Sequence, residues 1–202
     1  MKIPFFASFI IFIVWLAYEL SKVRRRSEKR EASFWEKEAQ ANHTRRKPLD
    51  GLNYITIPFE KLPMELLADD EKISECHRIL GVLKDSPVVN FTGISNTELK
   101  LEYGAPNINL LMRYDENYTT LVSTLQKWAL LLYEAGYAAE AKNILEFAVS
   151  TDTDVSGTYR LLASIYTKEG QTGKIEDLLK RAENLRSGSK DTIVRILRES
   201  YR

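Results

Sequence analysis

Two consecutive segments decide the fold: residues 122–155, VSTLQKWALLLYEAGYAAEAKNILEFAVSTDTDV, and residues 156–189, SGTYRLLASIYTKEGQTGKIEDLLKRAENLRSGS. Side chains of similar kind recur in them at one constant interval, which is 34, as 159 minus 125 shows. The matched pairs are Leu125 and Tyr159, Trp128 and Leu162, Ala129 and Ala163, Leu132 and Tyr166, Ala141 and Ile175, Leu145 and Leu179, and Ala148 and Ala182. The spacing predicts an internal repeat in which each unit is two helices joined by a glycine-containing turn.

Each unit carries an alanine directly after a large apolar residue, and a second large residue follows three positions later. Two helices that cross closely need such a small residue at the contact. The pattern resembles the tetratricopeptide repeat, a helix-turn-helix unit of about 34 residues. Two features depart from it: Ile175 replaces a small residue, and the proline that often ends a unit is absent. An irregular helical bundle is the alternative interpretation.

The resemblance implies that the first helix of each unit lines a concave groove that holds a peptide. The candidate groove residues on this alignment are Gln126, Lys127, Leu130, Tyr133, Arg160, Ser164 and Lys168. Three of them are cations, which favour a protein or peptide partner that presents acidic side chains or a C-terminal carboxylate. In the alternative interpretation these are ordinary solvent-facing polar residues.

Flanking segments complete the expected fold, which is mainly all-α. Residues 107–202 form the helical domain, in which residues 191–201 supply a closing helix. Residues 48–106 are expected to pack on the repeat as an extended strap, a helix over about 66–84, and irregular loops with a short helix at 96–103.

The N-terminal end predicts a membrane anchor. Residues 3–20, IPFFASFIIFIVWLAYEL, carry one formal charge, at Glu19. We therefore expect residues 1–20 to be an uncleaved transmembrane helix, with a secretory signal peptide as the alternative. A basic juxtamembrane helix or stalk, residues 21–47, follows. The positive-inside rule then predicts a single-pass protein with its N-terminus outside and its C-terminal domain in the cytoplasm.

Charge is distributed unevenly along the chain, although the formal net charge is only +1. Residues 21–47 hold ten Lys or Arg against four Asp or Glu, a net charge of +6. After an apolar stretch, such a segment is expected to face anionic lipid headgroups. The candidate membrane-surface residues are Arg24, Arg25, Arg26, Lys29 and Arg30.

No catalytic, cofactor-binding or metal-binding motif is found in the sequence. Cys76 is the single cysteine, and with His43 and His77 it falls short of an ordinary zinc site. Basic residues near the C-terminus alternate with acidic ones, which argues against nucleic acid as a partner. The sequence therefore predicts a membrane-anchored, protein-binding adaptor that is not an enzyme. The alternative is an accessory structural subunit of a larger membrane protein complex.

Overall fold

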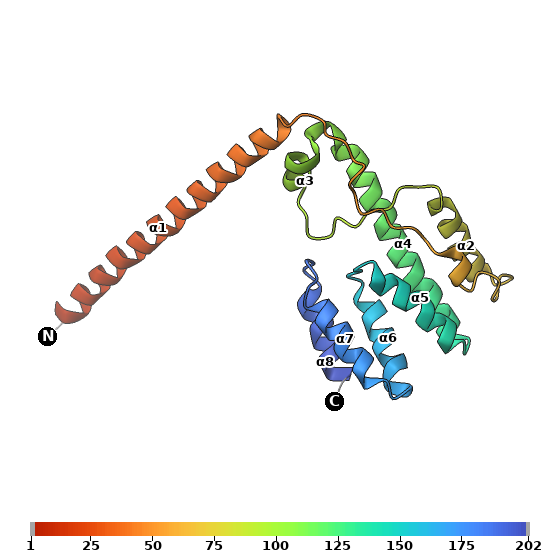
Figure 1. Cartoon of the computed structure of the whole chain (residues 1–202). Helices are drawn as coiled ribbons and strands as arrows, with labels where there is room; N and C mark the ends of the chain where they lie inside the picture. Colours follow the sequence, from red (N-terminus) through yellow and green to blue (C-terminus); the bar gives the residue numbers. More distant parts are fainter. Residues whose placement is uncertain (1–2, 201–202) are drawn as a thin grey trace. The chain divides into compact units, whose positions relative to one another are not determined.

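The computed structural model describes the backbone of residues 3–200 and the side chains of residues 8–200, and it is mainly α-helical (Figure 1). No β-strand occurs within residues 3–200, where strand-like pairing is limited to one isolated antiparallel bridge between Tyr54 and Val89. The predicted all-α class is therefore confirmed. The chain divides into two compact units: the residues up to Lys47 with Asn96–Pro106, and Pro48–Ser95 with the residues from Asn107 onward.

The first unit is built on one long helix, α1 (Ile3–Asn42), whose later half is rich in Glu, Lys, Arg and Ala, all good helix formers. A short helix, α3 (Asn96–Tyr103), packs against it. Glu38 links the two, because its carboxylate accepts hydrogen bonds from the Lys100 ammonium and, at 2.6 Å, from the Thr97 hydroxyl. The bond from Lys100 holds the pKa of Glu38 below its ordinary value.

The structure contradicts the predicted membrane anchor. Across the part of the chain that is described, none of the helices combines the length and the apolar character needed to cross a membrane. In α1, charged residues begin at Glu19, and Lys22 and Arg24 follow within the same helix, so most of its forty residues belong to a polar, charged segment.

This finding overturns the predicted localisation, a single-pass membrane protein with its N-terminus outside and its C-terminal domain in the cytoplasm. Residues 1–2 of the predicted anchor lie outside the described residues, as do the side chains of residues 3–7.

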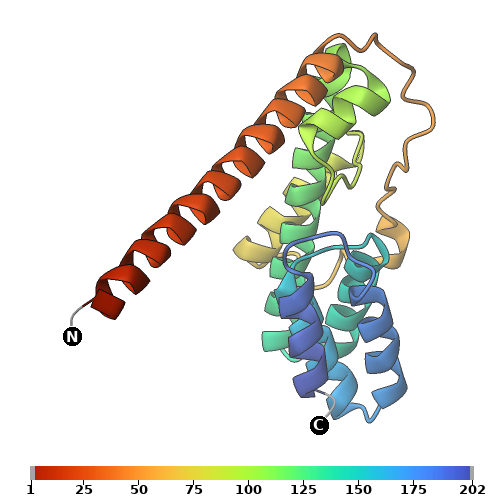
Figure 2. The same cartoon turned by 90° about the vertical axis from the view of Figure 1, so that its left-hand side faces the viewer.

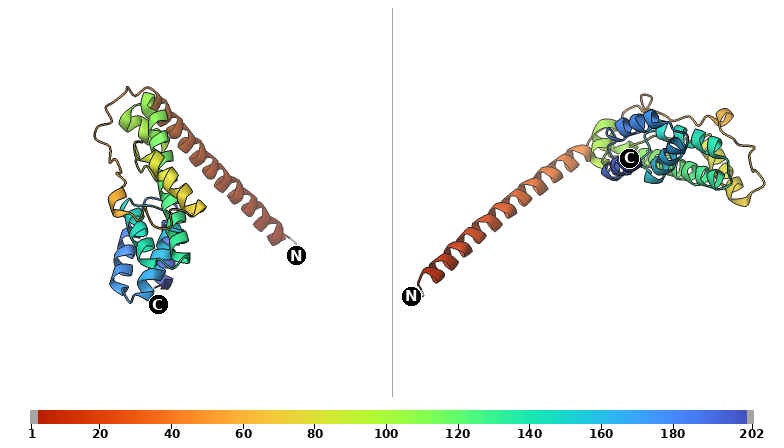
Figure 3. Two further views of the ribbon diagram at one scale, coloured as in Figure 1. Left: turned by 90° about the vertical axis from the view of Figure 1, so that its right-hand side faces the viewer. Right: turned by 90° about the horizontal axis from the view of Figure 1, so that it is seen from below.

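The second unit begins with an extended segment that leads to a short 3-10 helix, η1 (Phe59–Lys61). Ile57 and Leu62 are buried in the core, and the Ile55 amide donates to the Val88 carbonyl at 2.9 Å. Helix α2 (Glu71–Leu83) follows, capped by Asp70, whose carboxylate accepts from two backbone amides of the first turn. Figure 3 shows α2 beside α4, against which it packs.

Five further helices form the rest of this unit, preceded by a second 3-10 turn, η2 (Ala105–Asn107). They are α4 (Ile108–Glu134), α5 (Ala138–Ser150), α6 (Ser156–Lys168), α7 (Thr172–Ala182) and α8 (Lys190–Ser200), and each packs against the next (Figure 2). Their boundaries recur at the interval of the sequence repeat: α5 and α7 begin at 138 and 172, α6 and α8 begin at 156 and 190, and α4 and α6 end at 134 and 168. The period of the sequence is therefore also a period of the structure.

The turns between paired helices have the same geometry in both repeats. Gly136 and Gly170 have left-handed φ angles of +93° and +68°. Each helix end is closed by a backbone bond that spans five positions, from the Tyr137 amide to the Leu132 carbonyl at 2.9 Å and from the Gln171 amide to the Tyr166 carbonyl at 2.8 Å. These bonds satisfy carbonyls that the helix ends would leave unpaired.

The core of this unit lies between the helices. Trp128 and Tyr159 are completely buried, and each large side chain of this kind contributes about 1.5–3 kcal/mol through removal from water. Ala129 and Ala163 are also completely buried, as expected for small residues at close helix contacts. Helix α8 adds three buried side chains, Ile193, Ile196 and Leu197. Residue 201 of the predicted closing helix lies outside the described residues.

Candidate functional site

The predicted groove residues lie on α4 and α6. Gln126, Leu130 and Tyr133 follow one another on α4 at intervals of four and three residues, so they share one side of that helix. Arg160, Ser164 and Lys168 follow on α6 at intervals of four residues, with the same consequence. We call these six residues, with Lys127, the α4–α6 face. Lys127 lies at its edge, because it directly follows Gln126 and helps to lower the pKa of Glu75 on α2.

Gln126 joins the two helices. Its side-chain oxygen accepts a hydrogen bond from the Thr158 hydroxyl at 3.0 Å, and Thr158 is completely buried. The side chain also lies close to the α6 backbone, since a Cβ at Gly157 would be 2.9 Å from Gln126 Nε2. Gln126 is therefore a structural link between α4 and α6 at one end of the face.

Tyr133, Ser164 and Lys168 gather at the other end of the face. The Lys168 ammonium donates to the Tyr133 hydroxyl at 2.5 Å and lies 5.1 Å from the centre of the Tyr133 ring. This hydrogen bond lowers the pKa of Tyr133, and a hydrogen bond with Ser164 acts in the same direction. Lys168 forms no ion pair with a described residue, so the bond to Tyr133 fixes the position of its ammonium without an acidic partner.

The other two cations of the face, Lys127 and Arg160, are exposed and form no ion pair with a described residue. Leu130 is 40% exposed, which is a large fraction for leucine on a packed helix. The face thus carries an exposed apolar side chain and two cations, Arg160 and Lys168, with Lys127 at its edge toward α2. Such a surface can bind a segment that carries carboxylates and an apolar anchor.

Helix α8 extends the face, and the sequence alone did not indicate this. It packs against α6, starts one repeat period after it, and places Val194 and Arg198 at the positions of Arg160 and Ser164. Arg198 pairs with Glu183 at 3.3 Å. The repeat was hard to recognise here because Leu197 occupies the position of the buried alanine Ala163.

The predicted membrane-surface residues, Arg24, Arg25, Arg26, Lys29 and Arg30, are all exposed on α1. Arg24 pairs with Glu28 at 3.0 Å, a surface interaction of little energetic weight.

Cys76 and His77 belong to the packing between α2 and α4. Burial raises the pKa of the Cys76 thiol, which makes a reactive thiolate unfavourable. The His77 ring lies edge-on to Trp128 with their centres 4.8 Å apart. Within residues 3–200, no group of three or more His, Cys, Asp or Glu side chains is arranged to hold a metal ion.

The structure thus defines a mainly α-helical protein with a repeating structural period and a cationic face on α4 and α6. Comparison with protein families, with curated proteins and with solved structures finds no significant match to this chain.

Proposed function

We propose that the chain is a protein-binding module of the tetratricopeptide-like kind, rather than an enzyme, and that the α4–α6 face binds an acidic peptide segment. The observation that carries the proposal is the combination of one common period in the helix boundaries with three cations on the helices that open successive repeats. The proposal does not require a membrane anchor.

The contacts of the face support different roles for its residues. Gln126 and the pair Tyr133 and Lys168 fix the two ends of the face through hydrogen bonds between α4 and α6. Arg160 remains available to a ligand, whereas Lys127 also interacts electrostatically with Glu75 of α2. Because these side chains stand on packed helices rather than on loops, the face is ordered before a ligand arrives, which lowers the entropic cost of binding.

The first experiment selects peptides with free C-termini from a random library displayed to the purified chain. The proposal predicts that the selected peptides are rich in Asp and Glu and contain an apolar residue. Their dissociation constants, measured by fluorescence anisotropy, should rise at least tenfold for Lys127→Glu and for Arg160→Glu. This corresponds to about 1.4 kcal/mol for each charge reversal.

Lys180→Glu is the matched control, because Lys180 is an exposed lysine on α7, away from the α4–α6 face. It should change the dissociation constant less than about twofold, the scale expected of a distant screened charge. If all three charge reversals weaken peptide binding equally, the effect comes from the overall charge of the chain, and the proposed face is refuted. Selection of peptides without acidic residues would refute the partner class.

A further inference from the structure

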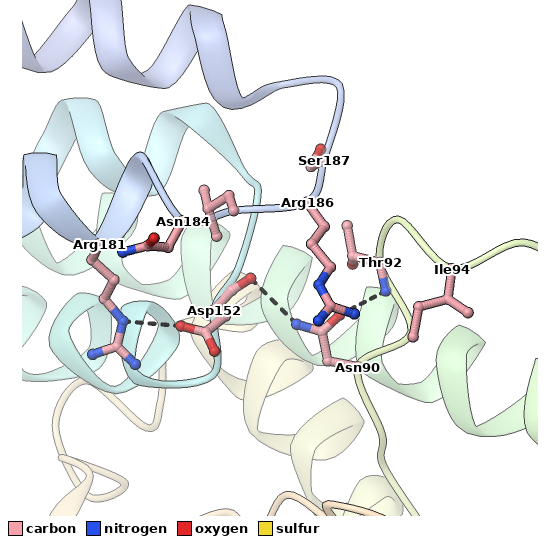
Figure 4. A pocket seen from close by; sticks show the side chains of 9 residues that line it. Asn90, Thr92, Ile94, Asp152, Arg181, Asn184, Arg186 and Ser187 are labelled. Atoms are coloured by element: carbon pink, nitrogen blue, oxygen red, sulfur yellow. Dashed lines mark hydrogen bonds and ion pairs between the residues drawn. The ribbon is translucent and has the colours of Figure 1, made fainter.

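A cavity of about 460 Å³ lies in the second unit, on residues outside the α4–α6 face. Three segments surround it: the loop 90–94, the turn between α5 and α6, and the end of α7 with the residues that follow (Figure 4). A volume of this size falls in the range of about 300–1,000 Å³ that small organic ligands occupy in proteins.

Asn90 holds this cavity in shape. Its amide nitrogen donates to the Tyr118 hydroxyl at 3.0 Å and to the Thr151 carbonyl at 2.9 Å, and its oxygen accepts from the Thr92 amide at 2.9 Å. All the polar atoms of the Asn90 side chain are therefore engaged in keeping the loop 90–94 against the helices. Asn90 is a structural part of the wall rather than a group awaiting a ligand.

The opposite wall touches this loop directly. Gly93 has a φ of +79°, and a Cβ there would lie 2.5 Å from the Arg186 carbonyl oxygen. No other residue type fits both the backbone angle and the space, so the loop and the segment after α7 are locked together. The cavity is therefore preformed, and a ligand would not have to order it.

Two arginines line the cavity, and they differ in their partners. Arg181 is engaged, since its guanidinium donates to Asp152 at 3.0 Å and to the Ser150 carbonyl at 3.0 Å. Arg186 makes no hydrogen bond or ion pair with any described residue, and Figure 4 shows its side chain directed toward the side formed by Asn90 and Thr92. The Thr92 hydroxyl is likewise without a hydrogen-bond partner within the described chain.

We propose that this cavity binds a phosphate group carried by a small organic molecule. The Arg186 guanidinium offers a planar fork of donors that matches two phosphate oxygens, and the Thr92 hydroxyl donates to a third. A tetrahedral phosphate can accept from donors on two walls at once, whereas a planar carboxylate is satisfied by the guanidinium alone. Leu185 and Ile94 add apolar surface for the organic part of the ligand.

The test titrates the full chain, labelled with ¹⁵N, with phenyl phosphate, inorganic phosphate and benzoate, and follows the amide chemical shifts. Phenyl phosphate should move the amides of residues 91–94 and 184–188 in a saturable manner. Inorganic phosphate should act on the same amides with lower affinity, and benzoate should bind at least tenfold more weakly than phenyl phosphate. Equal affinity for benzoate would overturn the assignment of phosphate as the ligand class.

Variants then test the residues. Arg186→Ala should weaken phenyl phosphate binding at least tenfold, and Arg186→Lys should restore only part of it, because an ammonium lacks the planar fork. Ile94→Glu is an independent second variant, since it places a negative charge at the wall and should also abolish binding. Arg113→Ala removes an exposed arginine of α4 and should leave binding unchanged. Unchanged binding in Arg186→Ala, or shifts elsewhere in the chain only, would overturn the proposal.

Discussion

Asn90 connects three parts of the second unit through one side chain. Hydrogen bonds donated by its side-chain amide join the loop 90–94 to Tyr118 on α4 and to Thr151 in the turn after α5. Tyr118 is 2% exposed, and burial raises its pKa to about 12, so its hydroxyl depends on internal partners. The Tyr118 hydroxyl also donates to the Thr151 carbonyl at 3.0 Å, so both groups keep a partner when Asn90 is removed, and the cost is that of the hydrogen bonds that Asn90 itself makes, at about 1 kcal/mol each.

Asn90→Ala should therefore lower the free energy of unfolding by about 2–3 kcal/mol, measured by urea denaturation. Asn117→Ala is the control, because the side chain of this partly exposed asparagine donates to a single acceptor, the Pro87 carbonyl, at 2.9 Å. It should cost no more than about 1 kcal/mol. Similar losses in the two variants would contradict the role given to Asn90.

His77 makes the stability of the unit depend on pH. Its Nε2 is buried without a hydrogen-bond partner, and burial lowers the pKa of the ring below its ordinary value of 6.5. The unfolded chain therefore takes up a proton at a higher pH than the folded chain does. The associated stability is fully present above pH 6.5 and is lost as the pH falls from there through the folded pKa.

The measurement compares urea unfolding at pH values of about 7.5 and about 5.5, on either side of the ordinary histidine pKa. The native chain should lose stability between these values, and His77→Phe, which keeps a ring against Trp128, should lose less. His43→Gln alters the other histidine, at the end of α1, and should retain the full loss. If His77→Phe and the native chain lose the same stability between these pH values, the pH dependence does not come from His77.

At the scale of elements, the two turns that set the repeat should respond alike to substitution. Gly136 and Gly170 have positive φ angles, and an added Cβ at either would meet no atom within 4 Å. The cost of alanine is therefore conformational only, about 1–2 kcal/mol at each site. Gly173 is the second residue of α7 and has equally open surroundings, so Gly173→Ala should stabilise the protein, by less than the roughly 1 kcal/mol expected in a helix interior.

Urea midpoints of the three variants test this account of the turns. If Gly136→Ala and Gly170→Ala change the free energy of unfolding in opposite directions, the two turns are not equivalent. The period seen in the helix boundaries would then not extend to the stability of the turns.

The helices of the repeat were predictable because the apolar positions and turn glycines of residues 122–189 mark them. Helix α8 was predictable as a helix but not as a continuation of the period, since Leu197 hides the pattern. The N-terminal helix was also predictable as a helix, whereas its interpretation as a membrane span was overturned.

The groove residues were selected through the resemblance to the tetratricopeptide repeat, and that alignment rests on spacing along the sequence. The spacing of residues along one helix does not predict which side chains form hydrogen bonds with a neighbouring helix. It therefore could not show that Gln126 binds Thr158 or that Lys168 binds Tyr133. Arg186 and Thr92 lie far apart in the sequence, and no local pattern brings them to one cavity.

For the molecule as a whole, we propose two binding surfaces with different chemistry, both in the second unit. The α4–α6 face is open and cationic, which suits an acidic peptide. The cavity at Arg186 is small and preformed, which suits a phosphate group. Because the two surfaces share no residue, substitutions in one should leave the other intact.

Amide hydrogen exchange of the chain, with and without a selected acidic peptide, tests most directly whether the α4–α6 face binds the peptide. We expect added protection on the second half of α4, on α6 and on α8, together with loss of that protection in Arg160→Glu. Protection confined to α5 and α7, or to α1, would show that the peptide binds elsewhere and would contradict the proposed function.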